Sequence, residues 1–271
     1  MSAAVAVEEA AAPQARQVLL DERSAFQRVF VVEEDGLRVL RFDAIAGNDQ
    51  SAFDPSKPDR VVFEYVRLAG LALKLVERPQ RALVIGLGGG AFPRLLLSRD
   101  DKVVVDAVEI DPVVIDASRR FFRLPASPRL HVHTGDGVAY IARARAGYDI
   151  VLLDAFSAEG IPASLSSKAF FADARRVLAE RGVAVMNLAL VGPAEMELIT
   201  QRFAEAFPGC VVVTGKAEDN RMLFGARVPV AIDGVRVAAL MSSPVLGYDA
   251  HADVEEILPC PMRTKIPKSM K

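Results

Sequence analysis

Several features that would point to a particular class of protein are scarce in this sequence. Its 33 basic and 35 acidic residues leave a formal net charge of −2, which gives no sign of nucleic acid or an anionic membrane as a main partner. It has only two cysteines, and Cys210 and Cys260 form no CxxC or other metal-binding spacing. Such cysteines predict reduced thiols in a cytoplasmic protein, with Cys210 as a small core residue.

Long hydrophobic runs are lacking as well. Residues 68–76 form an apolar helical run, but charged residues lie in and beside it, and it is too short to span a bilayer. The first 16 residues are small and apolar, yet Glu8 and Glu9 interrupt them and no basic region precedes them. They are predicted to be a flexible arm and not a signal peptide. The 271 residues, 51% hydrophobic, predict one main domain with an appendage and no membrane partner.

Residues 81–111 carry the most informative pattern of the chain. An apolar run ends in a cluster of glycines, a helix-like segment follows, and a second apolar run ends in Glu109 and Asp111. The glycines are Gly86, Gly88, Gly89 and Gly90. They allow a ligand to approach the backbone and the free N–H groups of the next helix. Glu109 follows Gly86 at the spacing at which a carboxylate can bind a ribose diol. The unit predicts a nucleoside-binding site.

A small N-terminal cap is predicted before this unit. Residues 17–42 alternate between apolar and polar positions on either side of the turn at residues 34–36, which predicts a β-hairpin. Residues 43–58 are rich in turn formers and are predicted to be a loop that completes the cap. Residues 59–77 have helical spacing and are ended by Pro79.

Strands and helices alternate after the glycine unit. Helices are predicted at residues 112–122, 138–145, 168–180 and 193–206, and strands at residues 129–134, 148–156, 182–190, 210–215 and 222–228. The pattern predicts an α/β, doubly wound sheet with a terminal antiparallel hairpin, the class I methyltransferase-like variant of the Rossmann architecture. Residues 59–230 would form this nucleoside-binding catalytic domain. Residues 231–271 are predicted to hold one helix, at 235–241, and a loose tail.

Ligands of such sheets bind outside the carboxyl ends of the strands. Glu109 can bind a ribose there, Asp136 can accept from an adenine amino group, and Ile110 can cover the ring. Asp111 precedes Pro112 and is predicted to be a helix N-cap. Asp154 ends an apolar strand, where an unpaired carboxylate is costly, so it is predicted to be functional. His131 and His133 have no third ligand nearby and predict no metal site.

Four motifs resemble the spermidine synthase-like branch of the S-adenosylmethionine-dependent methyltransferase superfamily. They are residues 86–94, VEID at 108–111, GDG at 135–137 and YDIVLLDAFS at 148–157. The upstream segment with Ser24, Phe26 and Gln27 resembles the N-terminal hairpin of that branch, so the resemblance runs from about residue 24 to residue 228.

The resemblance implies a role for each matching position. Glu109 would bind the ribose and Asp136 the adenine. The turn of Gly86, Gly88 and Gly90 would lie along the amino-acid or aminopropyl side of S-adenosylmethionine or its decarboxylated form, and Asp154 would face the sulfonium. The implied pocket residues also include Ile110 and Gly137, with Gln27 and Gln50 closing it from the cap. The resemblance further implies a homodimer or a tetramer.

Three departures from the family bear on the reaction. Spermidine synthases have acids where this chain has Gly89 and Ser157, and a tyrosine where it has Phe63. Both acids help to bind and activate a cationic amine, which titrates near lysine's ~10.4. Phe63, Phe92, Phe156 and Ser157 would therefore surround a less cationic small acceptor, which favours methyl transfer from S-adenosylmethionine. Asp154 or Tyr65 would be the base, and Glu159 is a weaker candidate.

Three alternatives stay open. The first is a polyamine aminopropyltransferase that uses decarboxylated S-adenosylmethionine. The second is an NAD-dependent oxidoreductase, which shares the glycine turn and the distal acid but not the terminal hairpin or the Asp136 turn. The third is a non-catalytic nucleoside-binding module.

Overall fold

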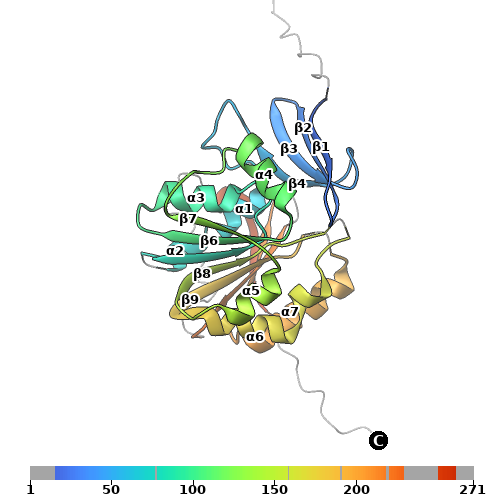
Figure 1. The fold of residues 1–271 in the computed structure, drawn as a ribbon. Helices are drawn as coiled ribbons and strands as arrows, with labels where there is room; N and C mark the ends of the chain where they lie inside the picture. The colour runs from blue at the N-terminus through green and yellow to red at the C-terminus, as the bar shows by residue number, and fades with distance from the viewer. Residues whose placement is uncertain are drawn as a thin grey trace, which may run out of the picture.

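The computed structural model describes residues 16–76, 78–157, 159–189, 191–217, 220–228 and 250–260. These residues form two sheets, one of four strands near the N-terminus and one of eight strands that carries the helices (Figure 1). The predicted arm at residues 1–15 and the predicted helix at residues 235–241 lie outside the described residues. Within the described part of the chain, no helix is both long enough and apolar enough to cross a bilayer.

The N-terminal sheet is an antiparallel meander in the order β1-β2-β3-β4. Its strands are β1 (Gln17–Arg23), β2 (Arg28–Glu34), β3 (Leu37–Phe42) and β4 (Asp49–Phe53). The β2-β3 hairpin turns at Asp35 and Gly36, both with positive φ, as the sequence predicted. The predicted loop at residues 43–58 is wrong in part, because β4 lies within it and pairs with β3. Its side chains at residues 51–53 are buried, so a polar sequence becomes a strand through tertiary contacts.

The large sheet has the order β12-β10-β11-β9-β8-β5-β6-β7. The parallel strands are β5 (Arg81–Ile85), β6 (Val104–Glu109), β7 (Leu130–Thr134), β8 (Tyr148–Leu153) and β9 (Leu178–Asn187). An antiparallel hairpin of β10 (Val211–Gly215) and β11 (Arg221–Ala226) follows, and β11 pairs with β9. The predicted doubly wound sheet with a terminal hairpin is confirmed.

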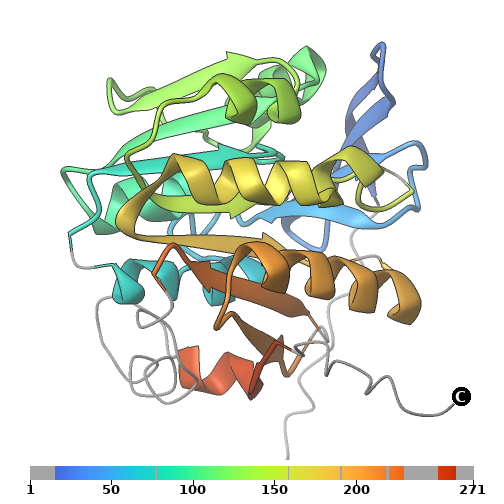
Figure 2. The ribbon, with the colours of Figure 1, turned by 90° about the horizontal axis from the view of Figure 1, so that it is seen from below.

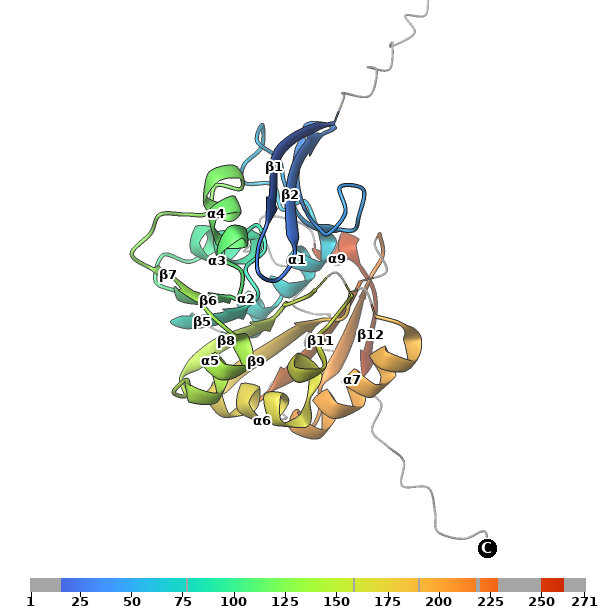
Figure 3. The ribbon, with the colours of Figure 1, turned by 45° about the vertical axis from the view of Figure 1, so that its right-hand side comes forward.

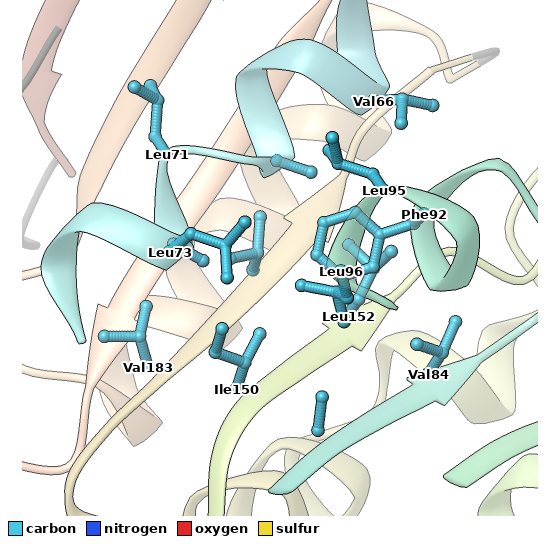
Figure 4. Packing of buried hydrophobic residues seen from close by; sticks show 14 of the residues in the cluster. Val66, Leu71, Leu73, Val84, Phe92, Leu95, Leu96, Ile150, Leu152 and Val183 are labelled. Carbon is cyan, nitrogen blue, oxygen red and sulfur yellow. The ribbon is translucent and has the colours of Figure 1, made fainter. Parts of the chain in front are cut away.

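Helices cover both faces of this sheet (Figures 2 and 3). One face carries α1 (Glu64–Ala69), α2 (Ala72–Leu75), α3 (Ala91–Arg99) and α4 (Pro112–Phe121). The other carries α5 (Gly137–Arg143), α6 (Lys168–Val177) and α7 (Pro193–Ala206), with the short 3-10 helix η1 (Ala163–Ser166) before α6. Alternate residues of one strand point into the two cores: Val84 of β5 packs under α3 (Figure 4), and its neighbour Leu83 packs on the α6 side. Burial on both faces explains the continuous apolar runs of the parallel strands.

The predicted helix at residues 59–77 is two short helices. It begins only at Glu64, because the Arg67 guanidinium donates to the carbonyls of Val61 (3.0 Å) and Val62 (2.7 Å) and holds that segment outside the helix. Residues 70 and 71 separate α1 from α2. The helical periodicity was detected correctly, but the start of the helix depends on hydrogen bonds from the Arg67 side chain to the segment before it.

A further strand lies at the edge of the large sheet, where a loose tail was predicted. After α9 (Ala250–Asp253), β12 (Val254–Pro259) runs antiparallel to β10. The Cys260 amide donates to the Cys210 carbonyl, and the two cysteines form a disulfide with a Cα–Cα distance of 5.4 Å. The prediction of two reduced thiols is therefore wrong, because strand pairing joins residues that are 50 positions apart. Both cysteines are buried, as was predicted for Cys210.

Candidate active site

Two adjoining cavities open at the carboxyl ends of the parallel strands. The first, here called the glycine-loop chamber, has a volume of about 350 Å³ and lies against Gly86, Gly88 and the ends of β6 and β8. The second, here called the tyrosine chamber, has a volume of about 590 Å³ and contains Tyr65 in its wall. Four residues line both chambers: Gln50, Gly88, Asp154 and Phe156. A molecule in one chamber can therefore meet a molecule in the other beside Asp154.

Most of the predicted nucleoside-binding residues surround the glycine-loop chamber. Those in its wall are Gln27, Gln50, Gly86, Gly88, Glu109, Ile110, Asp136, Gly137 and Asp154. They come from the N-terminal sheet and from the loops after β5, β6, β7 and β8. The structure thus brings together residues that the sequence could assign only one strand at a time.

The glycine turn requires glycine at two positions for different reasons. Gly86 has φ +93°, and a Cβ on it would lie 2.2 Å from the Asp154 carbonyl oxygen. It therefore allows the turn after β5 to pass close to the loop after β8. Gly90, with φ +71°, begins α3, and a Cβ there would lie 2.4 Å from Leu124 Cδ1. Gly90 packs against Leu124 and is not in the wall of the chamber, so its predicted contact with a cofactor stays a prediction.

The carboxylate of Glu109 is held at the end of β6 by backbone donors. Its Oε2 accepts from the Leu87 amide at 3.0 Å and its Oε1 from the Asp111 amide at 3.1 Å. Burial raises the pKa of Glu109, and the donated N–H groups of Leu87, Asp111 and Gly88 oppose that rise. The side chain is fixed beside Ile110, which is 42% exposed and offers an apolar surface to the chamber.

Asp111 is the N-cap of α4, as predicted, and also anchors the N-terminal sheet. Its Oδ1 accepts from the Val113 amide at 2.9 Å, and the Ser24 hydroxyl donates to its Oδ2 at 2.6 Å. The same Ser24 oxygen accepts from the amides of Phe26 and Gln27. This network fixes the β1-β2 turn over the glycine-loop chamber, where Phe26 and Gln27 form part of the wall.

Asp136 combines the turn role and the chamber position that the sequence suggested for it. It is the N-cap of α5 and accepts from the Val138 amide at 2.8 Å. It is exposed toward the chamber, so a carboxylate oxygen remains accessible to a ligand. Gly137 brings α5 close to β5, because a Cβ on it would lie 2.4 Å from Ile85 Cγ2.

Asp154 lies directly after β8, at the junction of the two chambers. The amide Nδ2 of Asn187 donates to its Oδ1 at 3.0 Å, and the Tyr65 hydroxyl also donates to the carboxylate. Burial raises the pKa of Asp154 to about 7, although both hydrogen bonds favour the charged form and limit the rise. Such a carboxylate can exchange a proton near neutral pH, which is the property of a general base.

The tyrosine chamber has apolar and neutral polar walls. Phe63, Phe156 and Met196 give apolar surface, and Asn187 and Asn220 give amide groups. Its other described carboxylate besides Asp154 is Asp49, which accepts from the Arg41 guanidinium at 2.6 Å. Arg41 is 6% exposed and also pairs with Glu34, so the charge of Asp49 is compensated within the N-terminal sheet.

Sequence reasoning missed the two asparagines of this chamber. Asn187 ends an apolar strand as Asp154 does, and that shared position was a usable signal. Asn220 precedes β11 in a polar turn, and nothing in the local pattern distinguishes it. Its amide donates to the buried Glu64 carboxylate at 3.5 Å, which is a contact across 156 residues of sequence.

Several predicted substrate contacts are wrong or displaced. Phe92 is 3% exposed and packs in the core beneath α3 (Figure 4). Ser157 lies in the wall of the glycine-loop chamber and not of the tyrosine chamber, and its hydroxyl donates to the Gly160 carbonyl at 3.2 Å. Glu159 is exposed on that loop and lines neither chamber. Phe63 and Phe156 do line the tyrosine chamber.

The histidines pair with a carboxylate away from both chambers. His131 Nδ1 and His133 Nε2 lie 3.2 and 3.1 Å from Asp106 Oδ1, and the Tyr148 hydroxyl donates to Asp106 Oδ2 at 2.9 Å. Among the residues that the structure describes, no group of three or more His, Cys, Asp or Glu side chains is arranged for a metal ion.

The fold and the two chambers define a Rossmann-type protein of the class I methyltransferase architecture. The chain belongs to the spermine/spermidine synthase domain family, whose model matches residues 63–213. The polyamine aminopropyltransferase of Vibrio vulnificus is 37% identical over 175 residues, which cover 63% of this chain and 58% of that protein. The polyamine aminopropyltransferase of Chromobacterium violaceum is 31% identical over 224 residues, which cover 82% of this chain and 79% of that protein.

A solved methyltransferase has the same architecture. Human methyltransferase-like protein 13 in complex with SAH superposes with a TM-score of 0.62 at 25% identity, covering 70% of this chain and 93% of that chain. The alignment with the Vibrio vulnificus protein leaves more than a third of that protein unmatched, since it spans 58% of its length. Similar proteins are thus named both as aminopropyltransferases and as a methyltransferase.

Proposed function

We propose that the chain is a transferase that moves an aminopropyl group from decarboxylated S-adenosylmethionine to a small amine. The observation that carries the proposal is the position of Asp154, a carboxylate with a pKa of about 7 at the junction of two adjoining chambers. The aminopropyltransferase relatives at 31–37% identity support this reaction better than the methyl transfer that the sequence alone favoured.

The donor would occupy the glycine-loop chamber. Glu109 would accept from the ribose hydroxyls and Asp136 from the adenine amino group, with the ring against Ile110. The sulfonium would then face Asp154, and the group to be transferred would point past Gly88 and Gln50 into the tyrosine chamber, because those residues line both cavities. Placing both reactants at one junction supplies the positioning on which an in-line displacement depends.

Asp154 would activate the acceptor by removing a proton. The acceptor ammonium gives its proton to the Asp154 carboxylate, and the freed lone pair attacks the methylene carbon bonded to sulfur. The carbon–sulfur bond breaks, its electrons return to sulfur, and 5′-methylthioadenosine leaves as a neutral thioether. An aliphatic ammonium titrates at ~10.4. A rise in the pKa of Asp154 from 3.8 to about 7 therefore makes the proton transfer less uphill by on the order of 4 kcal/mol.

Methyl transfer from intact S-adenosylmethionine is the second candidate. Gly89 stands where the family has an acid, and a Cβ at this position would lie 2.8 Å from both Phe122 Cδ1 and Ser51 Oγ. An acid at this position would require Phe122 and Ser51 to shift, and the turn as it stands lacks the acid that would bind a donor amine. This observation and the human methyltransferase at 25% identity favour an intact donor. The product would then be S-adenosylhomocysteine.

Donor binding followed by turnover separates these candidates. Thermal shifts would be measured with S-adenosylmethionine, its decarboxylated form, 5′-methylthioadenosine, S-adenosylhomocysteine and NAD, because a bound ligand raises the melting temperature by mass action. We expect the decarboxylated donor and 5′-methylthioadenosine to give the largest shifts, and mass spectrometry to detect aminopropylated putrescine. A preference for S-adenosylmethionine and S-adenosylhomocysteine would replace the first candidate by the second. Stabilisation by NAD alone would contradict both.

A further inference from the structure

Asn187 is a buried polar residue beside Asp154 for which the proposed reaction assigns no role. It is the last residue of β9, a central strand of the large sheet, and it is 3% exposed. The preceding Met186 pairs with Leu153 of β8, and Asn187 itself pairs with Met222 of β11. Strands on both sides therefore fix its backbone next to Asp154.

The two ends of the Asn187 amide have different partners, which fixes its orientation. Its Oδ1 accepts from the Ala189 amide at 3.1 Å, and its Nδ2 donates to Asp154 Oδ1 at 3.0 Å. A flipped amide would place two donors together at Ala189 and two acceptors together at Asp154. Only one orientation satisfies both neighbours, so Asp154 Oδ1 always faces an N–H donor.

This arrangement gives Asp154 Oδ1 a fixed donor at the junction of the two chambers. Asn187 therefore holds the carboxylate in place together with the Tyr65 hydroxyl, which donates to the same group. The donor on Oδ1 also favours the charged carboxylate, which opposes the effect of burial. Without it, the carboxyl group would hold its proton to higher pH and would be unavailable as a base over more of the neutral range.

We propose that Asn187 is a positioning residue, which holds the Asp154 carboxylate at the junction of the two chambers through Oδ1 and favours its charged form. The proposal rests on the proposed function for its consequence in turnover, whereas its effect on Asp154 is independent of any reaction. Other titratable side chains in the walls around Asp154 are Tyr65 of α1, Asp49 of β4, Glu109 of β6 and Asp136 before α5. Of these, Tyr65 forms a hydrogen bond with Asp154. All of the variants below keep Tyr65, so its effect on Asp154 is common to them.

The direct test is the titration of Asp154 by carbon-13 NMR of labelled aspartate carboxyls, with the signal assigned by Asp154→Asn. Removing a hydrogen bond to a charged group weakens the charged form by about 1.5–3 kcal/mol, which corresponds to one to two pH units. In Asn187→Ala we therefore expect the midpoint to move upward by about one pH unit or more. Asn220→Ala is the matched control, because it makes the same change in the same chamber at an amide bonded to Glu64.

A second variant keeps the experiment decisive if Asn187→Ala folds poorly. Asn187→Asp preserves the size of the side chain and the acceptor for Ala189, but it replaces the donor by a second acid. Two carboxylates at this distance cannot both ionise readily, so the midpoint of Asp154 should rise further. A midpoint equal to that of the wild type in the variants that fold would overturn the proposal.

Turnover gives the functional readout. The acid limb of kcat/KM is expected near pH 7 in the wild type and at higher pH in Asn187→Ala, whereas a structural defect alone would lower the rate equally at every pH. Absence of transfer by the wild type with every donor would contradict the proposed function but leave the NMR titration as a separate test of Asn187. A shifted NMR midpoint with an unshifted acid limb would refute the role of Asn187 in catalysis.

Discussion

Asp154 should make the protein less stable at alkaline pH, and Asp154→Asn should reverse this. A carboxyl group with a higher pKa in the folded protein than in the unfolded chain binds its proton more tightly when folded. Its contribution to stability is present below pH 3.8 and is lost as the pH rises through about 7. Asparagine has the same size and no charge, so the variant removes the cost of burying the anion while it also removes the proposed base.

The expected magnitude follows from the two pKa values. At pH 8 the full difference between the pKa of 3.8 in the unfolded chain and about 7 in the folded protein applies. Burial of the Asp154 carboxylate then lowers the free energy of unfolding by on the order of 4 kcal/mol. At pH 5 the folded protein is still protonated and the cost is only about 1–2 kcal/mol. Urea denaturation at both pH values should therefore show that Asp154→Asn gains about 2–3 kcal/mol more over the wild type at pH 8 than at pH 5.

A stability difference that is the same at both pH values would refute the reasoning. So would a variant that is less stable at pH 8, because the carboxylate would then be stabilising in its charged form. Asp116→Asn is the control for the chemical change, since Asp116 is an exposed carboxylate of α4 paired with Arg120 at 2.8 Å. Exposed ion pairs contribute at most about 1 kcal/mol, so that variant should differ little from the wild type.

Two further predictions concern the donor site and the edge of the sheet. Glu109→Ala should weaken binding of the preferred donor at least about tenfold by calorimetry, because hydrogen bonds to a charged group contribute about 1.5–3 kcal/mol each; unchanged affinity would remove Glu109 from the site. Cys260→Ser should lower the free energy of unfolding by about 2–4 kcal/mol through loss of the Cys210–Cys260 bond. Wild type treated with a reductant should match that variant in denaturant titrations, and a wild type insensitive to reductant would contradict a stabilising disulfide.

The parts of the site that the sequence predicted are those encoded at the end of one strand. Gly86 follows β5, Glu109 ends β6 and Asp136 follows β7, and each stands in a local pattern of apolar run and polar end. The rule that parallel strands share one carboxyl edge then brings these residues together. The same reasoning placed Asp154 correctly. The alternation of strands and helices likewise predicted a doubly wound sheet with a terminal hairpin.

The remaining features depend on contacts that no local pattern contains. Phe92 is one of several apolar residues on α3, and only the packing of that helix decides that it enters the core. β12 and its disulfide depend on pairing between residues that are 50 positions apart. β4 has a polar sequence and becomes a strand because β3 pairs with it. The predicted homodimer and cytoplasmic location stay predictions.

The contact of Gly89 with the N-terminal sheet restricts how this protein can change by mutation. Ser51 of β4 and Phe122 after α4 occupy the space that a side chain at position 89 would need. An acid there would displace both side chains, one of them in the other sheet. Overpacking of this kind costs about 1–3 kcal/mol. A single substitution to an acid at position 89 is therefore expected to lower the stability of the protein unless the side chains at positions 51 and 122 become smaller.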